Sequence, residues 1–191
     1  MIKYAIVGNI ASGKSEMERV LDKHGFVVLD SDLMAHDVLM DKPDVAKAFS
    51  DYDVFEYGRL SREKLGKLVF NDSELKQKLE GIVHPLILEE IKTAFETFKD
   101  EKMIFVSVPL LFEVGWEKNF DKIIFVKSED NIRLERLMNR NGYTKEYAQK
   151  RIASQSSQNE KIKKSDYVIE NNSTKEEFIK KVEDFIETIS V

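Results

Sequence analysis

Residues 8–15 read Gly8-Asn9-Ile10-Ala11-Ser12-Gly13-Lys14-Ser15. This run satisfies the pattern G-x-x-x-x-G-K-[ST], in which the backbone N–H groups of a glycine-rich loop point inward at phosphate groups. Residues 2–7 before the loop are typical of a strand, and the residues after it repeat apolar side chains at helical spacing up to Gly25. A strand, a glycine-rich loop and a helix in this order predict an α/β fold that begins with a phosphate-binding loop (P-loop).

The loop predicts that ATP and Mg²⁺ are the cofactors, with all eight residues of the motif in contact with the nucleotide. We expect Lys14 to reach the β- and γ-phosphates and the hydroxyl of Ser15 to bind the Mg²⁺ that bridges them. Taken alone, each residue also fits a purely structural role. Lys14 would then be a surface cation, and Ser15 would be an ordinary residue of the first helical turn. Their joint spacing with the glycines favours the phosphate site.

Short β-rich runs alternate with helical patterns along the rest of the chain, which predicts a three-layer α/β core with a mainly parallel sheet. The expected strands are residues 2–7, 26–29, 103–108, 122–126 and 167–169. The expected helices include 33–40, 75–83, 129–140 and 144–155, an apolar helical face from 88 to 98, and a closing helix that follows a capping box of Ser173 and Glu176. We predict one domain, with a core of about 1–30, 86–130 and 165–191, a helical substrate lobe of about 31–85 and a helical lid of about 131–160.

The composition limits the kinds of protein to which the chain can belong. A chain of 191 residues, 42% of them hydrophobic, is long enough for one sizeable core. Because cysteine is absent, disulfides, thiolate metal sites and a thiol nucleophile are excluded, which suits a cytoplasmic location. No apolar run reaches the roughly 20 residues that a membrane helix needs. The net charge of −5 argues against a general affinity for nucleic acid.

Two carboxylates follow the second predicted strand, in the run Asp30-Ser31-Asp32. Ligands of open α/β sheets bind beyond the carboxyl ends of the strands, so these side chains are expected near the P-loop. A kinase that phosphorylates a hydroxyl needs a carboxylate to orient it and accept its proton, and we assign this catalytic role, with a part in binding Mg²⁺, to Asp32. The alternative is that Asp32 only caps the next helix.

Arg133, Arg136 and Arg140 have the spacing of one side of a helix. They begin a stretch, 133–164, with nine Lys or Arg against three Asp or Glu. A mobile lid that carries arginines can neutralise the charge that develops on a transferred phosphoryl group and exclude water. We therefore predict that Arg136 and Arg140 bind ATP and that Arg140 also takes part in catalysis, although a merely solvated helical face has the same pattern.

With these features placed, the sequence resembles the dephospho-coenzyme A kinase family over nearly its whole length. The resemblance rests on the P-loop and on the order and spacing of short motifs: Asp30-Ser31-Asp32 with Ala35-His36, Gly58-Arg59-Leu60-Ser61-Arg62, His84-Pro85, Val108-Pro109-Leu110-Leu111-Phe112-Glu113, Arg136-Leu137-Met138-Asn139-Arg140, Arg151-Ile152-Ala153-Ser154-Gln155 and Asp166-Tyr167-Val168-Ile169-Glu170-Asn171.

The resemblance implies a P-loop kinase that transfers the γ-phosphoryl group of ATP to the ribose 3′-hydroxyl of dephospho-coenzyme A, the last step of coenzyme A synthesis. It matches Asp32 to the general base and Arg140 to a lid arginine. The positions that it places near the acceptor substrate are His84, Leu110, Leu111 and Glu113. From the residues alone, His84 would equally suit a helix end, and the leucines would equally suit the core.

The chain departs from the family pattern at several positions. Asn9 and Ala11 stand where glycine is frequent, Glu16 where threonine is typical, and Glu170 where aspartate is common before Asn171. Ser107 lies near a strand end where many relatives have an acid, so Asp32 is expected to carry more of the Mg²⁺ shell, through water.

Two rival functions remain at this point. One is a P-loop kinase of another small molecule, such as a nucleoside, a nucleotide or a shikimate-like alcohol. The other is a nucleotide-dependent switch, which the arginine-rich lid and the lack of an Asn-Lys-x-Asp motif disfavour.

Overall fold

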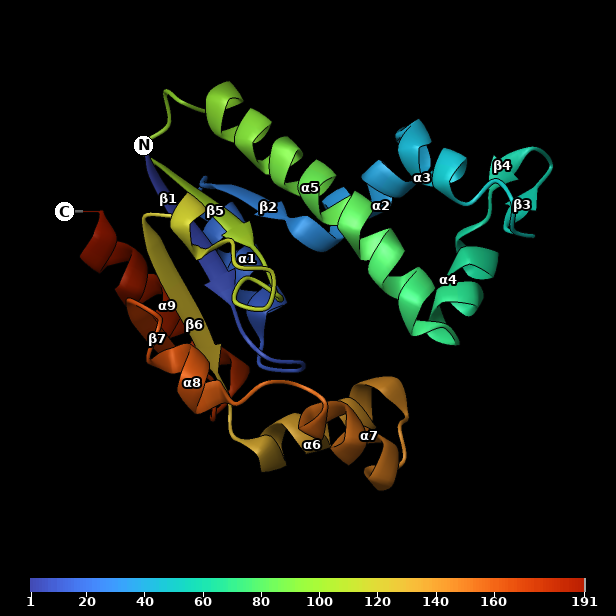
Figure 1. Ribbon diagram of the computed structural model, residues 1–191. Helices are drawn as coiled ribbons and strands as arrows, with labels where there is room; N and C mark the ends of the chain where they lie inside the picture. The colour runs from blue at the N-terminus through green and yellow to red at the C-terminus, as the bar shows by residue number, and fades with distance from the viewer. Residues whose placement is uncertain (191) are drawn as a thin grey trace. The chain divides into compact units, whose positions relative to one another are not determined.

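The computed structural model describes residues 1–190, apart from the side chains of residues 40 and 41. The chain divides into two compact units: unit 1 consists of residues 1–29 and 98–191, and unit 2 of residues 30–97 (Figure 1). Each unit is described by itself below.

Unit 1 is built on a five-stranded sheet with the order β2-β5-β1-β6-β7. Its strands are β1 (Ile2–Val7), β2 (Val27–Asp30), β5 (Met103–Ser107), β6 (Lys122–Lys127) and β7 (Tyr167–Glu170). The strand β1 pairs in parallel with β5 and β6, and β6 pairs in parallel with β7. The predicted α/β class and parallel sheet are confirmed, and the position of β1 at the centre places the end of this strand, where the P-loop begins, in the middle of the sheet.

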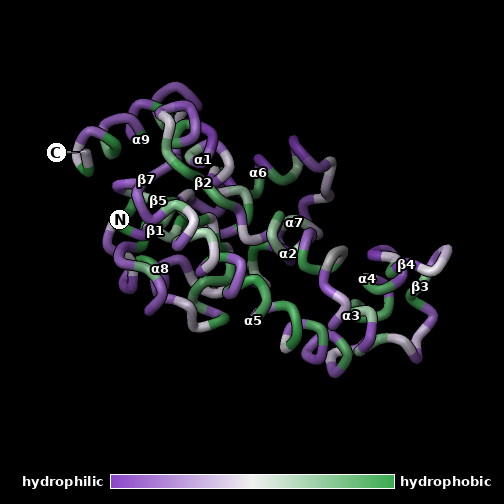
Figure 2. Tube along the Cα trace, turned by 90° about the horizontal axis from the view of Figure 1, so that it is seen from above, coloured by the Kyte–Doolittle hydropathy of each residue, from purple (hydrophilic) through white to green (hydrophobic). Residues whose placement is uncertain are grey.

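The helices α1 (Lys14–Lys23) and α9 (Lys175–Ile189) pack against each other and close the main hydrophobic core of unit 1. Hydrophobic residues run along the strands (Figure 2), and those of β1, β5, β6 and β7 meet Met17 and Leu21 of α1 and Phe178 and Val182 of α9. These four helical side chains are almost completely buried. Burial of this apolar surface, at about 25 cal/mol per Å², anchors α1 and with it the end of the P-loop.

The remaining α-helices of unit 1 follow β6. The helices α6 (Asp130–Asn141) and α7 (Lys145–Ala153) pack together as a hairpin, and α8 (Gln158–Ile162) leads on to β7. Gly142 ends α6 with a φ of +64°, and the side chain of Thr144 caps α7 by accepting the N–H of Tyr147. These two helices lie within two residues of the predicted ranges 129–140 and 144–155. A short 3₁₀ helix, η1 (Glu117–Asn119), precedes β6.

Unit 2 is arranged along one long helix, α5 (Ser73–Thr97), which contacts α2 (Ser31–Asp41), α3 (Pro43–Ala48) and α4 (Arg62–Phe70). The strands β3 (Phe55–Glu56) and β4 (Arg59–Leu60) form a small antiparallel hairpin. That unit 2 binds substrate and that residues 131–160 act as a lid stay predictions.

The helix α5 differs from the prediction, because it runs through Pro85 where the sequence indicated two helical pieces. A proline inside a helix lacks an N–H donor and its ring meets the carbonyl four residues earlier, at a cost of about 3 kcal/mol. The residue four positions before Pro85 is Gly81, which has no side chain. The buried stripe of Val83, Ile87, Ile91 and Phe95 spans the proline and offsets its cost.

The cap of α9 also differs from the prediction by one residue. Thr174, rather than Ser173, is the N-cap, and its hydroxyl accepts the N–H of Glu177 at 3.3 Å. Both Ser173/Glu176 and Thr174/Glu177 satisfy the capping-box spacing, so the pattern alone does not choose between them.

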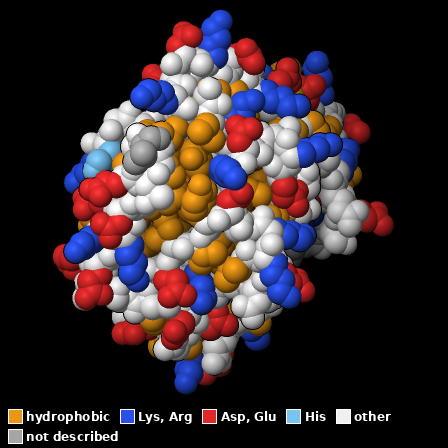
Figure 3. Space-filling view, turned by 90° about the vertical axis from the view of Figure 1, so that its left-hand side faces the viewer, with side chains coloured by type: hydrophobic (Ala, Val, Ile, Leu, Met, Phe, Trp, Pro, Cys, Tyr) orange, Lys and Arg blue, Asp and Glu red, His pale blue; other side chains and the backbone are white. Residues whose placement is uncertain are grey.

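The surface of one face is shown in Figure 3, where hydrophobic side chains gather at the centre and Lys, Arg, Asp and Glu side chains of both signs are interspersed around them. Among the described residues, no helix combines the length and the apolar character that crossing a membrane requires.

Candidate active site

The P-loop connects the central strand β1 to α1. Gly13 is the N-cap of α1 and has a φ of +106°, which only glycine adopts readily. A side chain at Gly13 would collide with the amide of Asn171, and a Cβ at Gly8 would lie 2.8 Å from the carbonyl oxygen of Val126. Both glycines of the motif are therefore required for the backbone to pack this closely.

Two polar atoms of the loop are buried without a hydrogen-bond partner among the described residues: Oγ of Ser12 and Oδ1 of Asn9. Leaving a buried polar group unpaired costs about 1–3 kcal/mol, and such atoms in native proteins call for an explanation. A hydroxyl donor beside a glycine-rich turn fits a phosphate ligand. The loop thus fits the triphosphate of a nucleotide.

Lys14 and Ser15 begin α1 at the mouth of the loop. The ammonium group of Lys14 donates to the carbonyl of Gly8 at 2.9 Å, so it lies across the curve of the loop. Ser15 is exposed, which leaves its hydroxyl accessible to a metal ion. Within the described part of the chain, no group of three His, Asp or Glu side chains is arranged to hold a metal ion.

Arg136 is bonded to the P-loop backbone. Its guanidinium donates to the carbonyls of Ala11 (3.3 Å) and Ser12 (3.5 Å), and on its other side to the side chain of Asn171 at 3.0 Å. Asn171 in turn donates to the carbonyl of Ser12 at 2.8 Å. Burial lowers the pKa of Arg136, against the opposing effect of Glu135, yet an arginine stays charged. The idea of a solvated face is wrong for Arg136, and its predicted contact with ATP remains a prediction.

Arg133 is also buried, with 1% of its surface exposed. It donates to the carbonyl of Ile10 at 2.9 Å and to the side chain of Gln155 at 3.0 Å. The same oxygen of Gln155 accepts the backbone N–H of Ile10 at 2.8 Å. The expectation that every N–H of the loop points at the phosphates is wrong at Ile10, because this N–H is bonded to Gln155.

A pocket of about 680 Å³ lies beside the loop, within unit 1. Its lining includes Gly13, Arg140, Asn171 and Phe178. Arg140 is exposed on the last turn of α6, where its guanidinium bonds the side chain of Asn141 at 3.0 Å. Arg140 is therefore on a solvated face of the helix, as the alternative expected. Because its guanidinium is exposed at the pocket, it is also accessible to a nucleotide.

Glu16 lines the same pocket and is neutralised by two cations. The side chain of Arg19 donates to it, and Lys175 lies 3.2 Å away. Hydrogen bonds from Arg19 and then Lys175 hold the pKa of Glu16 below its usual range, although burial opposes them. The extra negative charge at this position is thus paired within the protein.

Asp32 and His84 lie in unit 2. The N-cap of α2 is Asp30, whose carboxylate accepts the N–H of Asp32 at 2.8 Å. The capping alternative for Asp32 is therefore wrong, and its exposed side chain lies in the first turn of the helix. His84 is half-buried in the interior of α5, so it is not a helix-end residue.

The segment 110–113 follows β5 in unit 1. Leu111 is fully buried, as the core alternative expects, whereas Leu110 is 49% exposed. The carboxylate of Glu113 lies 2.8 Å from the buried ammonium of Lys161 and accepts the hydroxyl of Ser156 at 2.7 Å. Ser107, at the end of β5, is buried.

Three residues that contact the loop or its supports had no role in the sequence prediction: Gln155, Asn171 and Ser156. The first two lie inside the motifs that carry the family resemblance, which was the only signal for them. No local pattern links them to a loop that lies 145 to 159 residues away in the sequence.

Comparisons with known proteins give consistent matches over nearly the whole chain. A family model described as dephospho-CoA kinase matches residues 2–177. A dephospho-CoA kinase of Fusobacterium nucleatum is 42% identical over 187 residues, which cover 96% of each chain. Among solved structures, TT1252 from Thermus thermophilus superposes with a TM-score of 0.86 at 31% identity, covering 100% of this chain and 98% of that one. A dephospho-CoA kinase from Campylobacter jejuni gives a TM-score of 0.79 at 30% identity, covering 98% and 96%.

Proposed function

The chain belongs to the dephospho-CoA kinase family, and from this premise we propose that its P-loop site transfers the γ-phosphoryl group of ATP to the ribose 3′-hydroxyl of dephospho-coenzyme A, the last step of coenzyme A synthesis. The observation that carries the proposal is the P-loop, whose two required glycines and buried Ser12 hydroxyl fit a triphosphate. A cytoplasmic location stays an expectation that rests on the cysteine-free composition.

The reaction assigns one task to each group. The 3′-oxygen bonds to the γ-phosphorus as the bond to the β–γ bridging oxygen breaks, and the hydroxyl proton passes to the carboxylate of Asp32. Lys14 and the exposed Arg140 stabilise the charge on the phosphoryl oxygens. Mg²⁺ when bound neutralises the phosphates, and we assign Ser15, with Asp32 through water, to hold it.

Binding of the acceptor is assigned to His84, Leu110, Leu111 and Glu113 together with Asp32. The exposed side chain of Leu110 supports this assignment directly. Glu113 supports it differently, because its pairing with Lys161 fixes the turn that carries Leu110. For the buried Leu111, a packing role beneath the site is the contribution that we expect.

The experiment that tests the function measures ADP formation from ATP and Mg²⁺ with dephospho-coenzyme A, adenosine, AMP or shikimate as the acceptor. We expect turnover with dephospho-coenzyme A alone, and a product whose phosphate is on the 3′-oxygen. Turnover with another acceptor but not with this one would leave a kinase and reject the substrate. The Lys14→Ala variant is the control, because loss of its charge should abolish transfer to any acceptor.

A further inference from the structure

We propose that Gln155 and Arg133 are positioning residues that hold the P-loop in its phosphate-binding shape by clamping the backbone of Ile10. The proposal rests on the proposed function only in requiring that the loop binds a nucleotide. Neither residue is assigned here to contact substrate.

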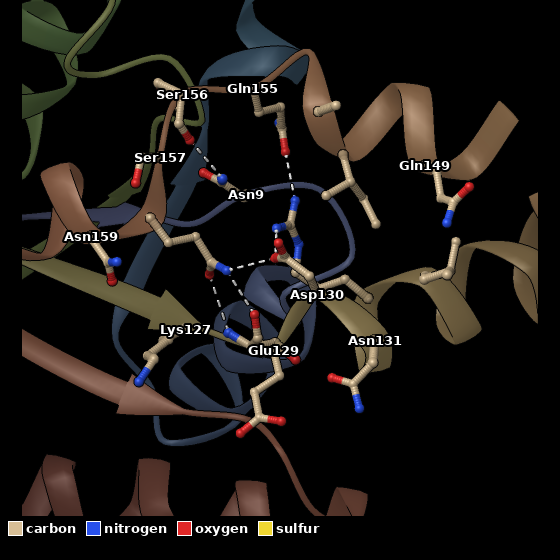
Figure 4. Close-up of a pocket in the computed structure, with 16 residues that line it drawn as sticks. Asn9, Lys127, Glu129, Asp130, Asn131, Gln149, Gln155, Ser156, Ser157 and Asn159 are labelled. Carbon is tan, nitrogen blue, oxygen red and sulfur yellow. Dashed lines mark hydrogen bonds and ion pairs between the residues drawn. The ribbon is translucent and has the colours of Figure 1, made fainter. Parts of the chain in front are cut away.

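The clamp takes both polar backbone groups of one loop residue. The N–H of Ile10 donates to Oε1 of Gln155 at 2.8 Å, and the carbonyl of Ile10 accepts Nε of Arg133 at 2.9 Å. A third bond, from Arg133 to the same Oε1 at 3.0 Å, closes the triangle. The dashed line from Gln155 in Figure 4 marks this third bond. The orientation of the peptide groups on either side of Ile10 is therefore set by two side chains from outside the loop.

Each member of the clamp is itself fixed. Arg133 is buried on the first half of α6 and bonds Asp130 at 2.7 Å. Gln155 follows the C-cap of α7, Ser154, and its own N–H bonds the carbonyl of Ile152 at 3.2 Å. A side chain held by its own backbone and by a buried cation has little freedom to move, which suits a residue that positions another group.

The next residue adds a second contact to the loop. The carbonyl of Ser156 accepts the side-chain N–H of Asn9 at 3.0 Å, and the hydroxyl of Ser156 donates to Glu113 at 2.7 Å. Glu113 is paired with Lys161, which is 3% exposed. Residues 155 and 156 therefore bond two consecutive loop residues, and Ser156 also joins the loop to the pair of Glu113 and Lys161.

The clamp acts through the loop and not on the phosphates. Because the N–H of Ile10 is directed at Gln155, it does not contribute to the phosphate cradle. Without the oxygen of Gln155, the N–H of Ile10 and a donor of Arg133 both lose their acceptor. The peptide group at Ile10 is then no longer held in its orientation and can rotate to find another partner. Small displacements of groups that bind the reacting phosphate reduce rates strongly.

The test compares Gln155→Met, which removes the acceptor at constant length, with Gln155→Glu, which keeps an acceptor for Ile10 and Arg133. Gln149→Met is the matched control, since Gln149 is an exposed residue of α7 that lines, together with Gln155, a second pocket of unit 1 (Figure 4). The first readout is the Kd of a fluorescent N-methylanthraniloyl derivative of ADP with Mg²⁺, which needs no acceptor. The second is the kcat and the two KM values with ATP and dephospho-coenzyme A.

We expect Gln155→Met to raise the Kd of the ADP derivative about tenfold and to lower kcat, with the KM for dephospho-coenzyme A unchanged. Gln155→Glu and Gln149→Met should stay within about threefold of the wild type. A general loss of structure in Gln155→Met would raise the KM for dephospho-coenzyme A as well as weaken nucleotide binding, so an effect confined to the nucleotide distinguishes positioning of the loop from it. Wild-type nucleotide binding by a folded Gln155→Met would overturn the proposal.

Two further outcomes are distinguishable. If dephospho-coenzyme A is not phosphorylated by the wild type, the proposed function fails, while the nucleotide Kd still decides the clamp. If Gln155→Met does not fold, Gln155→Asn replaces it, because asparagine keeps the amide but is one methylene too short to reach Ile10. Nucleotide binding by Gln155→Asn within threefold of the wild type would then reject the clamp.

Discussion

Asp30 and Asp32 occupy different positions at the start of α2, where Asp30 is the N-cap and Asp32 lies in the first turn. Asp30 caps α2 through its carboxylate, whereas the side chain of Asp32 is exposed in the first turn of the helix. We expect Asp32→Asn to lower kcat by roughly 10²–10⁴ and to leave ATP affinity unchanged, because only the proton acceptor is lost. Steady-state kinetics and a nucleotide titration measure the two quantities. The control is Asp37→Asn, an exposed carboxylate on the same helix, and near-normal turnover of Asp32→Asn would exclude it as the base.

Ala11 has a backbone conformation that favours glycine. Its φ of +60° lies in the left-handed region, which costs an L-residue about 1 kcal/mol. We expect Ala11→Gly to raise the free energy of unfolding in urea by about 1 kcal/mol. The same exchange in the helix α5, Ala94→Gly, should lower it by about 1 kcal/mol. A loss of stability at both positions would show that the strain at Ala11 is not relieved by glycine.

The residues of the P-loop were predictable because the motif is local and each member has a separate physical task. Arg133 and Arg136 were recognised as members of one helical stripe, and Arg136 was assigned to ATP, which stays a prediction. Their actual partners, the carbonyls of Ile10, Ala11 and Ser12, lie more than 120 residues away in sequence, and helical periodicity reports which residues share a face but not what faces them.

At the scale of elements, the strands of the sheet and the α6–α7 hairpin were predicted because burial and turn chemistry agree there. The prediction failed where two local rules competed. At Pro85 the rule that proline breaks helices competes with a continuous buried stripe, and the packing of the stripe prevails. At the start of α9 two overlapping residue pairs satisfy the capping-box spacing equally, and the structure uses the pair that begins at Thr174.

The turn after β5 is joined to α8 by the pair of Glu113 and Lys161, and this pair predicts a pH dependence. Burial would raise the pKa of Glu113, but the hydrogen bonds from Lys161 and Ser156 hold it below its ordinary value of 4.5. Its contribution to stability is then fully present above about pH 4.5 and is lost as the pH falls through the lower folded pKa. At neutral pH Glu113→Gln should lower the free energy of unfolding by about 2 kcal/mol, since Lys161 loses its partner.

Urea unfolding between pH 3 and 7 measures this effect. The difference between the wild type and Glu113→Gln should be constant at neutral pH and shrink below about pH 4.5. Glu101→Gln, at an exposed position, should differ little from the wild type at any pH. A difference that persists unchanged at pH 3 would contradict the assigned pair.

At the scale of the whole molecule, the sequence predicts one domain with a substrate lobe of about 31–85, and the structure has two compact units. The inserted helical region was recognised from residue 31 onward, whereas unit 2 extends through α5 to residue 97. The assignment of this unit to the acceptor came from the family resemblance, since no motif in it specifies a ligand by itself. The P-loop and the pocket beside it, by contrast, consist of residues of unit 1 alone.

This separation makes a prediction for hydrogen exchange. ADP with Mg²⁺ at about 100 times its Kd should stabilise the unit that binds it by about 2.7 kcal/mol. Amides of β1 and α1 that exchange through unfolding should therefore slow by about 100-fold, while those of α3 and α4 change little. Addition of dephospho-coenzyme A should then protect α2 and α5, which carry Asp32 and His84. Protection by the acceptor that stays within unit 1 would show that unit 2 is not the substrate lobe, and would move the search for the base from Asp32 to residues of unit 1.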